Sequence, residues 1–206
     1  MSRKERREIR QAMKKILANL DPRWVQAAQG KISENLGKLL AQLEPASINH
    51  ILAWTPFFAG EISIAPFISE QVALRSVYLP RTLSDSSMTF VKLGPDWDSS
   101  LQPGNFGIPE PTGSEIYDPA CAGSTLVLVP GLAFDKDGNR LGRGKACYDI
   151  FLGHQRLAAA IKVGVCWSLQ LVDNLPTESH DVMMDWICHE RALAKVSVEF
   201  DEDFEE

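Results

Sequence analysis

The chain has 206 residues, with 21 Lys and Arg against 27 Asp and Glu, and therefore a formal net charge of −6. Since one domain is usually about 150 residues long, the length predicts a single domain over residues 1–206 with its own hydrophobic core. Nucleic acid and anionic membranes both require a basic surface, so the acidic balance argues against these partners, whereas a small anionic ligand needs only local positive charge.

The charged N-terminal residues are followed by no apolar stretch, so no signal peptide is expected, and no apolar run is long enough to cross a bilayer. Its four cysteines contain no CxxC pair that would suggest a zinc or redox site. We therefore expect a cytoplasmic protein with reduced, mostly buried thiols, present as a monomer or a weak homo-oligomer.

Two amphipathic helices are predicted before the first strand. The first fifteen residues hold seven basic and two acidic side chains, and apolar residues recur at helical spacing over 9–20. Asp21 and Pro22 supply an N-cap and a first-turn proline for a second helix, whose apolar stripe runs over 25–43. Glu44-Pro45 is expected to end this second helix.

From residue 48 the pattern changes to short apolar runs bounded by Gly, Pro, Ser or Asp, which are typical of strands. These runs are 48–54, 76–79, 88–93, 126–129, 163–167 and 195–200, with helical segments predicted at 62–74 and 145–160. The alternation of helices and strands predicts an α/β fold, a three-layer α/β/α sandwich with a mostly parallel sheet. The Gly- and Pro-rich segment 94–124 is expected to be a functional or covering loop.

The segment 126–152 contains a buried strand, a glycine-rich loop and the start of a helix. Three cations and no carboxylate lie between Gly138 and Lys145, and Gly142 and Gly144 allow backbone N–H groups to approach a ligand. The N-terminus of the following helix adds positive potential. Neither the Walker A spacing nor the GxGxxG pattern is present. Phosphate binding is therefore predicted, and a basic loop that only turns the chain is the alternative.

The run PGLAFDKDGNRLGRGK at 130–145, followed by Tyr148-Asp149, resembles the signature of the 5-formyltetrahydrofolate cyclo-ligase family. Other segments resemble that family in the same order and span nearly the whole chain: Ile9-Arg10, Glu61, Leu79-Pro80-Arg81, Met88 with Phe90, 106–111, Leu175-Pro176 and His180-Asp181. The resemblance implies a fold related to the sugar-phosphate isomerase and CoA-transferase superfold. It also implies the ATP- and Mg²⁺-dependent closure of 5-formyltetrahydrofolate to 5,10-methenyltetrahydrofolate. In this reaction the formyl oxygen is phosphorylated, the N10 amine attacks the formyl carbon, and phosphate leaves.

The same resemblance implies the residues of the site. Arg143 and Lys145 would be the catalytic cations that hold the ATP phosphates and the transferring group. The other residues implied to contact ATP are Arg6, Arg10, Arg140, Leu141, Gly142, Gly144 and Tyr148; those implied to contact the folate are Pro56, Glu61 and Tyr148; and those implied to bind Mg²⁺ are Asp149 and Asp181, with Asp185 as an alternative to Asp181. Two aspartates suffice, because Mg²⁺ usually takes one or two carboxylates together with phosphate oxygens and water. The Glu61 carboxylate can accept hydrogen bonds from the amino group and ring N–H of a pterin.

Several of these residues also have ordinary structural explanations. Arg6 and Arg10 are one helical turn apart, and a solvent-exposed basic face needs no ligand. The implied carboxylates could equally be surface residues or first-turn helix residues. Phe57 and Phe58 are expected in the core rather than beside the pterin. His180 is assigned no catalytic role.

After the lysine the family usually continues Gly-Tyr-Tyr-Asp-Arg, whereas this chain has Ala146, Cys147 and Ile150 at three of the five positions. Ala146 would reduce the rate if its position requires a positive φ. Cys147 removes an aromatic surface and is expected to be a smaller packing residue rather than a reactive thiolate. These departures support a second hypothesis, a folate- or nucleotide-binding relative that has weakened catalysis and acts as a binding or regulatory module. A sugar-phosphate isomerase or CoA-transferase lacks support, because no acidic nucleophile motif is visible.

Overall fold

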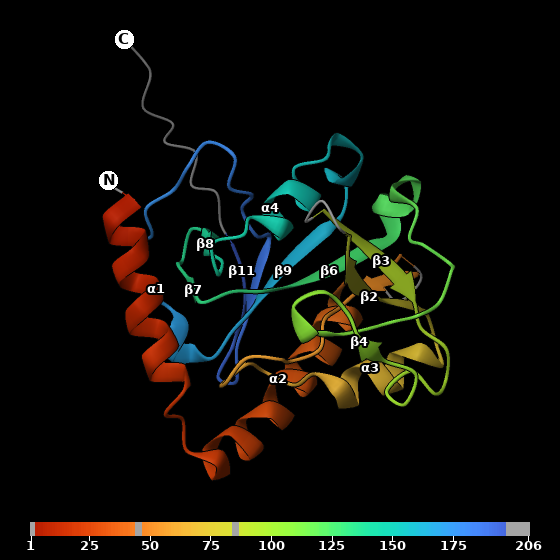
Figure 1. Cartoon of the computed structure of the whole chain (residues 1–206), viewed down its shortest axis with the longest axis horizontal. Coiled ribbons are helices and arrows are strands. Elements are labelled where there is room, and N and C mark those ends of the chain that lie inside the picture. Colours follow the sequence, from red (N-terminus) through yellow and green to blue (C-terminus); the bar gives the residue numbers. More distant parts are fainter. Residues whose placement is uncertain (1–2, 44–46, 84–86, 197–206) are drawn as a thin grey trace.

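The computed structural model describes residues 3–43, 47–83 and 87–196, and it is an α/β protein built on one central sheet (Figure 1). The sheet consists of β1 (His50–Leu52), β2 (Ser76–Thr82), β3 (Met88–Lys92), β6 (Thr125–Pro130), β9 (Ile161–Val165), β10 (Trp186–Cys188) and β11 (Leu193–Lys195). The helices are α1 (Arg3–Leu17), α2 (Pro22–Gln42), α3 (Ala65–Val72) and α4 (Cys147–Leu152). Two small hairpins, β4 (Gln102–Pro103) with β5 (Pro109–Glu110) and β7 (Ala133–Phe134) with β8 (Arg140–Leu141), lie outside the sheet.

The strand order in the sheet is β11-β10-β9-β6-β1-β2-β3. The pairs from β10 to β2 are all parallel, and only the edge strands β11 and β3 are antiparallel to their neighbours. The chain moves from β1 to β2 on one side and later to β6 on the other, so the direction of winding reverses between β1 and β6. In open α/β sheets, ligands bind in the crevice at the carboxyl ends of the strands at this switch point.

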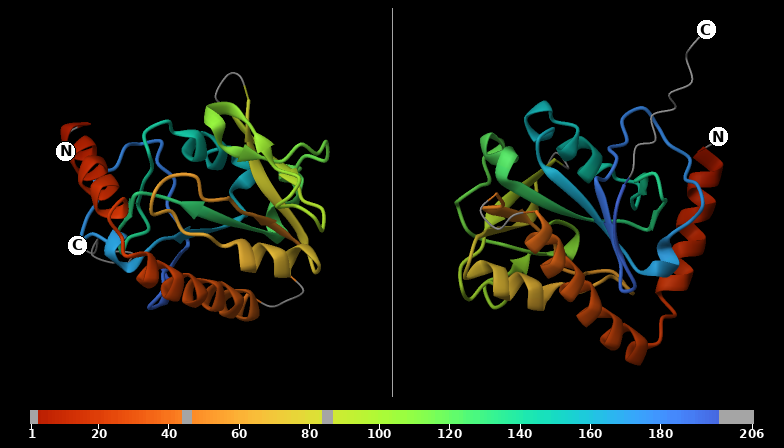
Figure 2. Two further views of the ribbon diagram at one scale, coloured as in Figure 1. Left: turned by 60° about the horizontal axis from the view of Figure 1, so that its bottom comes forward. Right: turned by 180° about the vertical axis from the view of Figure 1, so that it is seen from behind.

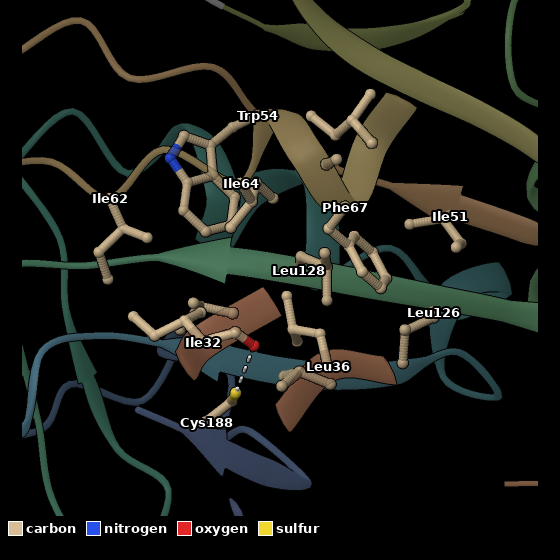
Figure 3. Packing of buried hydrophobic residues seen from close by; sticks show 14 of the residues in the cluster. Ile32, Leu36, Ile51, Trp54, Ile62, Ile64, Phe67, Leu126, Leu128 and Cys188 are labelled. Atoms are coloured by element: carbon tan, nitrogen blue, oxygen red, sulfur yellow. Dashed lines mark hydrogen bonds between the residues drawn. The ribbon is translucent and has the colours of Figure 1, made fainter. Parts of the chain in front are cut away.

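The α2 helix begins and packs as its sequence predicts. The Asp21 carboxylate accepts hydrogen bonds from the N–H groups of Arg23 at 2.7 Å and Trp24 at 3.4 Å, and Pro22 is the first helical residue. On the inward face, Ile32 and Leu36 are fully buried against the sheet (Figure 3). Glu44-Pro45, expected to end the helix, lies outside the described residues.

Helices cover both faces of the sheet. Figure 2 shows α2 and α3 on one face and α4 on the other, with α1 standing at one end beside the β7–β8 hairpin. One core cluster joins α2 and α3 to Leu126 and Leu128 of β6, and a second joins α4 to Val127 and Val129 on the opposite face. The predicted three-layer α/β sandwich with a mostly parallel sheet is therefore confirmed, and none of the described helices is long and apolar enough to span a membrane.

Some predicted boundaries are wrong. The helix expected at 145–160 is only α4 followed by a 3₁₀ turn at Gln155–Leu157, because Gly153 follows the first turns. The loop expected at 94–124 contains β4, β5 and the 3₁₀ turns Asn105–Gly107 and Pro119–Ser124. Most of the strand expected at 195–200 lies outside the described residues, and β10 was not predicted from its sequence Trp-Ile-Cys. All four cysteines are free thiols, of which Cys166 and Cys188 are buried, whereas Cys121 and Cys147 are only partly so.

Candidate functional site

The candidate site lies at the carboxyl ends of β1, β6 and β9, where the switch point places it. Gly60 is held at this edge because the Trp167 indole N–H donates to its carbonyl oxygen at 2.8 Å. The Gln170 amide donates to the carbonyl oxygen of Gly131, just after β6, at 2.8 Å. These bonds bring the 56–61 segment, which follows β1, close to the chain that leaves β6 at Gly131.

The glycine-rich loop at 142–145 contacts the basic face of α1. Arg10 Nε donates to the Gly142 carbonyl oxygen at 2.9 Å, and a Cβ on Gly144 would lie 3.7 Å from the Arg10 guanidinium. Gly144 has a φ of +102°, and Ala146 has a φ of +54°, the only positive φ of a non-glycine residue in the described chain. The position where the family usually has glycine is therefore left-handed, as expected if it requires a positive φ.

Arg143 joins this loop to the 56–61 segment. Its Nε and Nη2 lie 3.0 and 2.9 Å from Glu61 Oε1, and its guanidinium carbon lies 3.8 Å from the centre of the Phe58 ring. Glu61 Oε2 accepts hydrogen bonds from the N–H groups of Phe57 and Phe58 at 2.9 and 3.0 Å. The predicted phosphate-binding cation and the predicted folate-binding acid are therefore direct partners.

The placement of the two phenylalanines corrects a prediction. Phe57 and Phe58 are 44% and 41% exposed, so they are not in the core. Their rings pack edge to face with centroids 5.1 Å apart, which places an aromatic surface beside Glu61. Pro56 comes directly before them and is half-buried.

Arg140 forms a buried ion pair with Asp149. Its Nη2 donates to Asp149 Oδ1 at 2.8 Å, its Nη1 donates to the carbonyl oxygen of Pro130 at 3.2 Å, and its guanidinium lies 5.6 Å from the centre of the Tyr148 ring. Burial raises the pKa of the Tyr148 hydroxyl above its usual range, so this group stays protonated. Arg140 Nε and the Tyr148 hydroxyl are both buried without a hydrogen-bond partner in the described structure.

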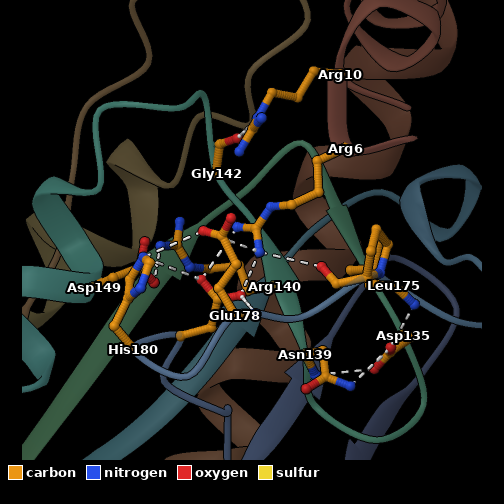
Figure 4. A network of polar contacts seen from close by, with 12 residues as sticks. Arg6, Arg10, Asp135, Asn139, Arg140, Gly142, Asp149, Leu175, Glu178 and His180 are labelled. Carbon is orange, nitrogen blue, oxygen red and sulfur yellow. Dashed lines mark hydrogen bonds and ion pairs between the residues drawn. The ribbon is translucent and has the colours of Figure 1, made fainter. Parts of the chain in front are cut away.

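Arg6 of α1 pairs with Asp181. Both side chains are less than a tenth exposed, and Arg6 also donates to the carbonyl oxygen of Pro176 (Figure 4). Burial opposes ionisation of Asp181, but hydrogen bonds from Arg6 and from the Glu178 N–H outweigh it, so the pKa of Asp181 is lowered. The hydrogen bond to Asp181 in turn raises the pKa of Arg6. Arg6 is therefore not part of a solvent-exposed basic face.

The structure distinguishes between the two alternatives for the second predicted metal ligand. Asp185 accepts a hydrogen bond from the Lys162 N–H at 2.7 Å and pairs with its ammonium at 3.0 Å, where β9 and β10 begin. Asp181 instead lies beside Arg6, with possible ligand atoms of Glu178, His180 and Asp181 within 4.8 Å of one another. Asp181 therefore remains the better candidate of the two.

One residue that shapes the site was missed in the sequence. Asp135 is fully buried, and its carboxylate accepts hydrogen bonds from the N–H groups of Asp137, Asn139 and Leu175. It closes the turn before the glycine-rich loop and joins it to the segment that carries Pro176, which accepts from Arg6 (Figure 4). An Asp-x-Asp-Gly turn in the sequence signals the local bonds, but not the contact with Leu175, 40 residues away.

The predicted residues are brought together, with differences in exposure. Lys145 is exposed at the mouth of the loop, whereas the Leu141 side chain is 1% exposed and packs in the core. The molecule is thus an α/β protein whose switch point carries guanidinium groups, left-handed loop backbone and a carboxylate, an arrangement that suits a small anionic ligand.

The sequence model of the 5-formyltetrahydrofolate cyclo-ligase family matches residues 2–190, so the chain belongs to this family. It is 31% identical over 185 residues to 5-formyltetrahydrofolate cyclo-ligase of Haemophilus influenzae, covering 88% of this chain and 96% of the relative. The corresponding protein of Saccharomyces cerevisiae is 28% identical over 204 residues, with 87% and 92% covered. The solved structure of Aquifex aeolicus 5,10-methenyltetrahydrofolate synthetase superposes with a TM-score of 0.76 at 27% identity, covering 97% of this chain and 99% of that one.

Proposed function

We propose that this chain catalyses the ATP-dependent cyclisation of 5-formyltetrahydrofolate to 5,10-methenyltetrahydrofolate, with release of ADP and phosphate. The observation that carries this proposal is the direct contact between Arg143 and Glu61, which joins a cationic loop suited to phosphate to a carboxylate suited to a pterin. Family membership and the relatives named above support the same reaction.

In the proposed mechanism the protein positions groups and neutralises charge, as in other phosphoryl transfers. Lys145 and Arg143 stabilise the phosphoryl group as it moves to the formyl oxygen. The N10 amine then attacks the formyl carbon, and the bond from that carbon to the phosphorylated oxygen breaks. Inorganic phosphate leaves and carries away the proton that N10 loses. Arg10 and the backbone of Gly142 and Gly144 hold the rest of the triphosphate.

Arg6 and Arg140 have a further role in this proposal. Each forms an ion pair with an aspartate, Arg6 with Asp181 and Arg140 with Asp149. Phosphate oxygens of ATP would compete with these carboxylates for the guanidinium donors. Binding of ATP is then expected to loosen both ion pairs.

Mg²⁺ is part of the proposal, and the donor set at the site fits it. Asp149 and Asp181 offer the oxygen ligands that Mg²⁺ prefers, and Glu178 provides a further carboxylate beside Asp181. When bound, Mg²⁺ would neutralise charge on the phosphates. The arginine partners of Asp149 and Asp181 hold these carboxylates in position.

The test uses purified protein, Mg·ATP and 5-formyltetrahydrofolate, and follows methenyltetrahydrofolate absorbance and ADP release together. Equal amounts of both products would support the proposal. A second candidate, a binding or regulatory module with weakened catalysis, draws support from the strained Ala146. Folate binding by calorimetry without either product would reject the cyclo-ligase and favour this module.

A further inference from the structure

We infer that Trp54 is a further substrate-binding residue, whose indole N–H donates a hydrogen bond to the ring carbonyl of the pterin and so selects 4-oxo folates over 4-amino analogues. This inference rests on the proposed function, because it adds a second contact for the ring that Glu61 is proposed to bind.

The indole N–H of Trp54 is an unusual buried donor. Trp54 follows β1 by two residues and is only 4% exposed, yet its Nε1 has no hydrogen-bond partner among the described residues. Two other tryptophans are paired, since the indole N–H of Trp167 donates to Gly60 at 2.8 Å and that of Trp97 to Ser69 Oγ at 3.2 Å. Buried polar groups are nearly always hydrogen-bonded, so the unpaired Nε1 requires an explanation.

Trp54 lines a small cavity that also contains Glu61. The cavity has a volume of about 10 Å³ and is lined by Leu17, Trp54, Gly60, Glu61, Ile62, Pro130, Gly131, Val165 and Gln170. In Figure 3 the indole nitrogen is on the side of the ring that points away from Phe67 and toward the carboxyl end of β6. The cavity shares Leu17, Gly60 and Glu61 with a groove of about 330 Å³ between the end of α1 and the start of α2. A ligand in the groove therefore needs to insert only one or two atoms to reach Trp54.

The other polar groups in the cavity wall are already occupied. Glu61 uses one oxygen for Arg143 and the other for two backbone N–H groups. The Gln170 side chain accepts from the Trp167 N–H and donates to Gly131 and Leu132. Trp54 is therefore the donor left for an incoming acceptor, and the cavity is about the size of one oxygen atom or one water.

The chemistry of the pterin edge matches this arrangement. An amino group, a ring N–H and a carbonyl oxygen follow one another along the edge of a 4-oxo pterin. On binding, the Glu61 carboxylate would exchange present partners for the first two, and the neighbouring carbonyl then requires a donor, which is the only role an indole N–H can take. A 4-amino analogue presents donors at that position, so two donors would face each other.

The test compares dissociation constants for 5-formyltetrahydrofolate and its 4-amino analogue by calorimetry. For wild-type protein we expect tighter binding of the 4-oxo form, and in Trp54→Phe we expect this preference to fall about tenfold. The control is Trp97→Phe, which removes an indole N–H that is already paired and should leave the ratio unchanged. If folded Trp54→Phe has the same ratio of the two dissociation constants as the wild type, the inference is overturned.

A second measurement needs no variant. With ¹⁵N-labelled tryptophan, we expect the indole N–H resonance of Trp54 to move downfield when 5-formyltetrahydrofolate binds, and not when the 4-amino analogue binds. An unmoved resonance under saturating 5-formyltetrahydrofolate would mean that water alone satisfies this N–H, and would overturn the inference while the proposed function stands. No folate binding to the wild type would overturn both.

Discussion

Arg143 and Glu61, 82 residues apart in the sequence, meet in an ion pair in which both guanidinium contacts, at 3.0 and 2.9 Å, reach the same carboxylate oxygen. The other oxygen of Glu61 is held by the N–H groups of Phe57 and Phe58. Arg143 thus links the glycine-rich loop to the 56–61 segment. Substitution of either residue of the pair is therefore expected to change the position of the other.

This link predicts that Arg143→Ala weakens the binding of both substrates. Loss of a charge-assisted hydrogen bond is worth about 1.5–3 kcal/mol, so we expect the KM for 5-formyltetrahydrofolate to rise at least tenfold, together with a rise in the KM for ATP. Steady-state kinetics with each substrate varied separately provides the measurement. Arg191→Ala, at an exposed arginine, is the control. A variant with an altered KM for ATP alone would show that the pair does not position Glu61.

Lys145 is expected to act on turnover rather than on stability. Its side chain is exposed, so Lys145→Ala should leave the thermal unfolding midpoint within about 1 °C while lowering kcat about 100-fold, as for loss of a group that stabilises developing charge. Lys136→Ala is the matched control, because Lys136 is an exposed cation in the turn that precedes the loop. Equal kcat values in the two variants would remove Lys145 from the proposed mechanism.

The sequence predicts the parts of the molecule that depend on local signals. The Asp21-Pro22 helix start, the apolar strands and the glycine-rich loop all lie close to their predicted places, because caps, periodicity and glycine act over a few residues. The short strand β10 was missed since three residues carry no periodicity, and its place in the sheet depends on pairing with β9.

The site itself follows less directly from the sequence. The resemblance supplied the residues that meet there, but not their partners, because the contacts of Arg6 with Asp181 and of Arg143 with Glu61 join distant parts of the chain. Hydrophobicity alone predicts that Phe57 and Phe58 lie in the core. They remain exposed because Glu61 fixes their backbone N–H groups at the surface, next to the cation that covers Phe58.

Ala146 is expected to lower the stability of the protein. Its φ of +54° is left-handed, which costs an L-residue about 1–2 kcal/mol relative to glycine. Replacement by glycine would remove this cost, but part of the gain in stability is offset by the greater freedom of glycine in the unfolded chain. Ala146→Gly should therefore raise the free energy of unfolding by about 1 kcal/mol, or 2–4 °C in Tm for a chain of about this length.

The control for this substitution is Ala158→Gly, because Ala158 is exposed with a right-handed φ of −56° and should lose stability. A loss of stability in both variants would show that Ala146 is not strained. Restoring the family's pair with Ala146→Gly and Cys147→Tyr together is expected to raise kcat if the departure also affects catalysis, whereas an unchanged kcat would show that it is neutral.

The Arg6–Asp181 pair predicts how stability depends on pH. Because the folded pKa of Asp181 lies below its unfolded value, the contribution of this group is fully present above the unfolded pKa of about 3.9 and is lost as pH falls through the folded pKa. Asp181→Asn should therefore be less stable than wild type by about 2 kcal/mol from neutral pH down to about pH 5, and the difference should shrink below about pH 4.

Urea unfolding at several pH values measures this difference. The exposed Asp173→Asn is the control and should follow the wild type throughout. If the difference in free energy of unfolding between wild type and Asp181→Asn stays constant down to pH 3, this result would contradict the lowered pKa of Asp181.

Asp149 is expected both to stabilise the fold and to bind Mg²⁺. Arg140 and Asp149 are 4% and 9% exposed, so Asp149→Ala leaves a buried guanidinium without its counter-ion and should lower the free energy of unfolding by about 3–5 kcal/mol. Asp149→Asn keeps the shape of the side chain and one acceptor oxygen, so the free energy of unfolding should fall by less. This variant is therefore the one to use for kinetics.

In Asp149→Asn we expect the Mg²⁺ concentration for half-maximal turnover to rise about tenfold or more, since an amide oxygen is a weaker ligand than a carboxylate. The matched control is Asp137→Asn, an exposed aspartate of the preceding turn, which should change neither stability nor the Mg²⁺ requirement. A loss of stability in Asp149→Asn with an unchanged Mg²⁺ requirement would restrict Asp149 to holding Arg140, and Asp181 and Glu178 would then be the carboxylates to substitute next.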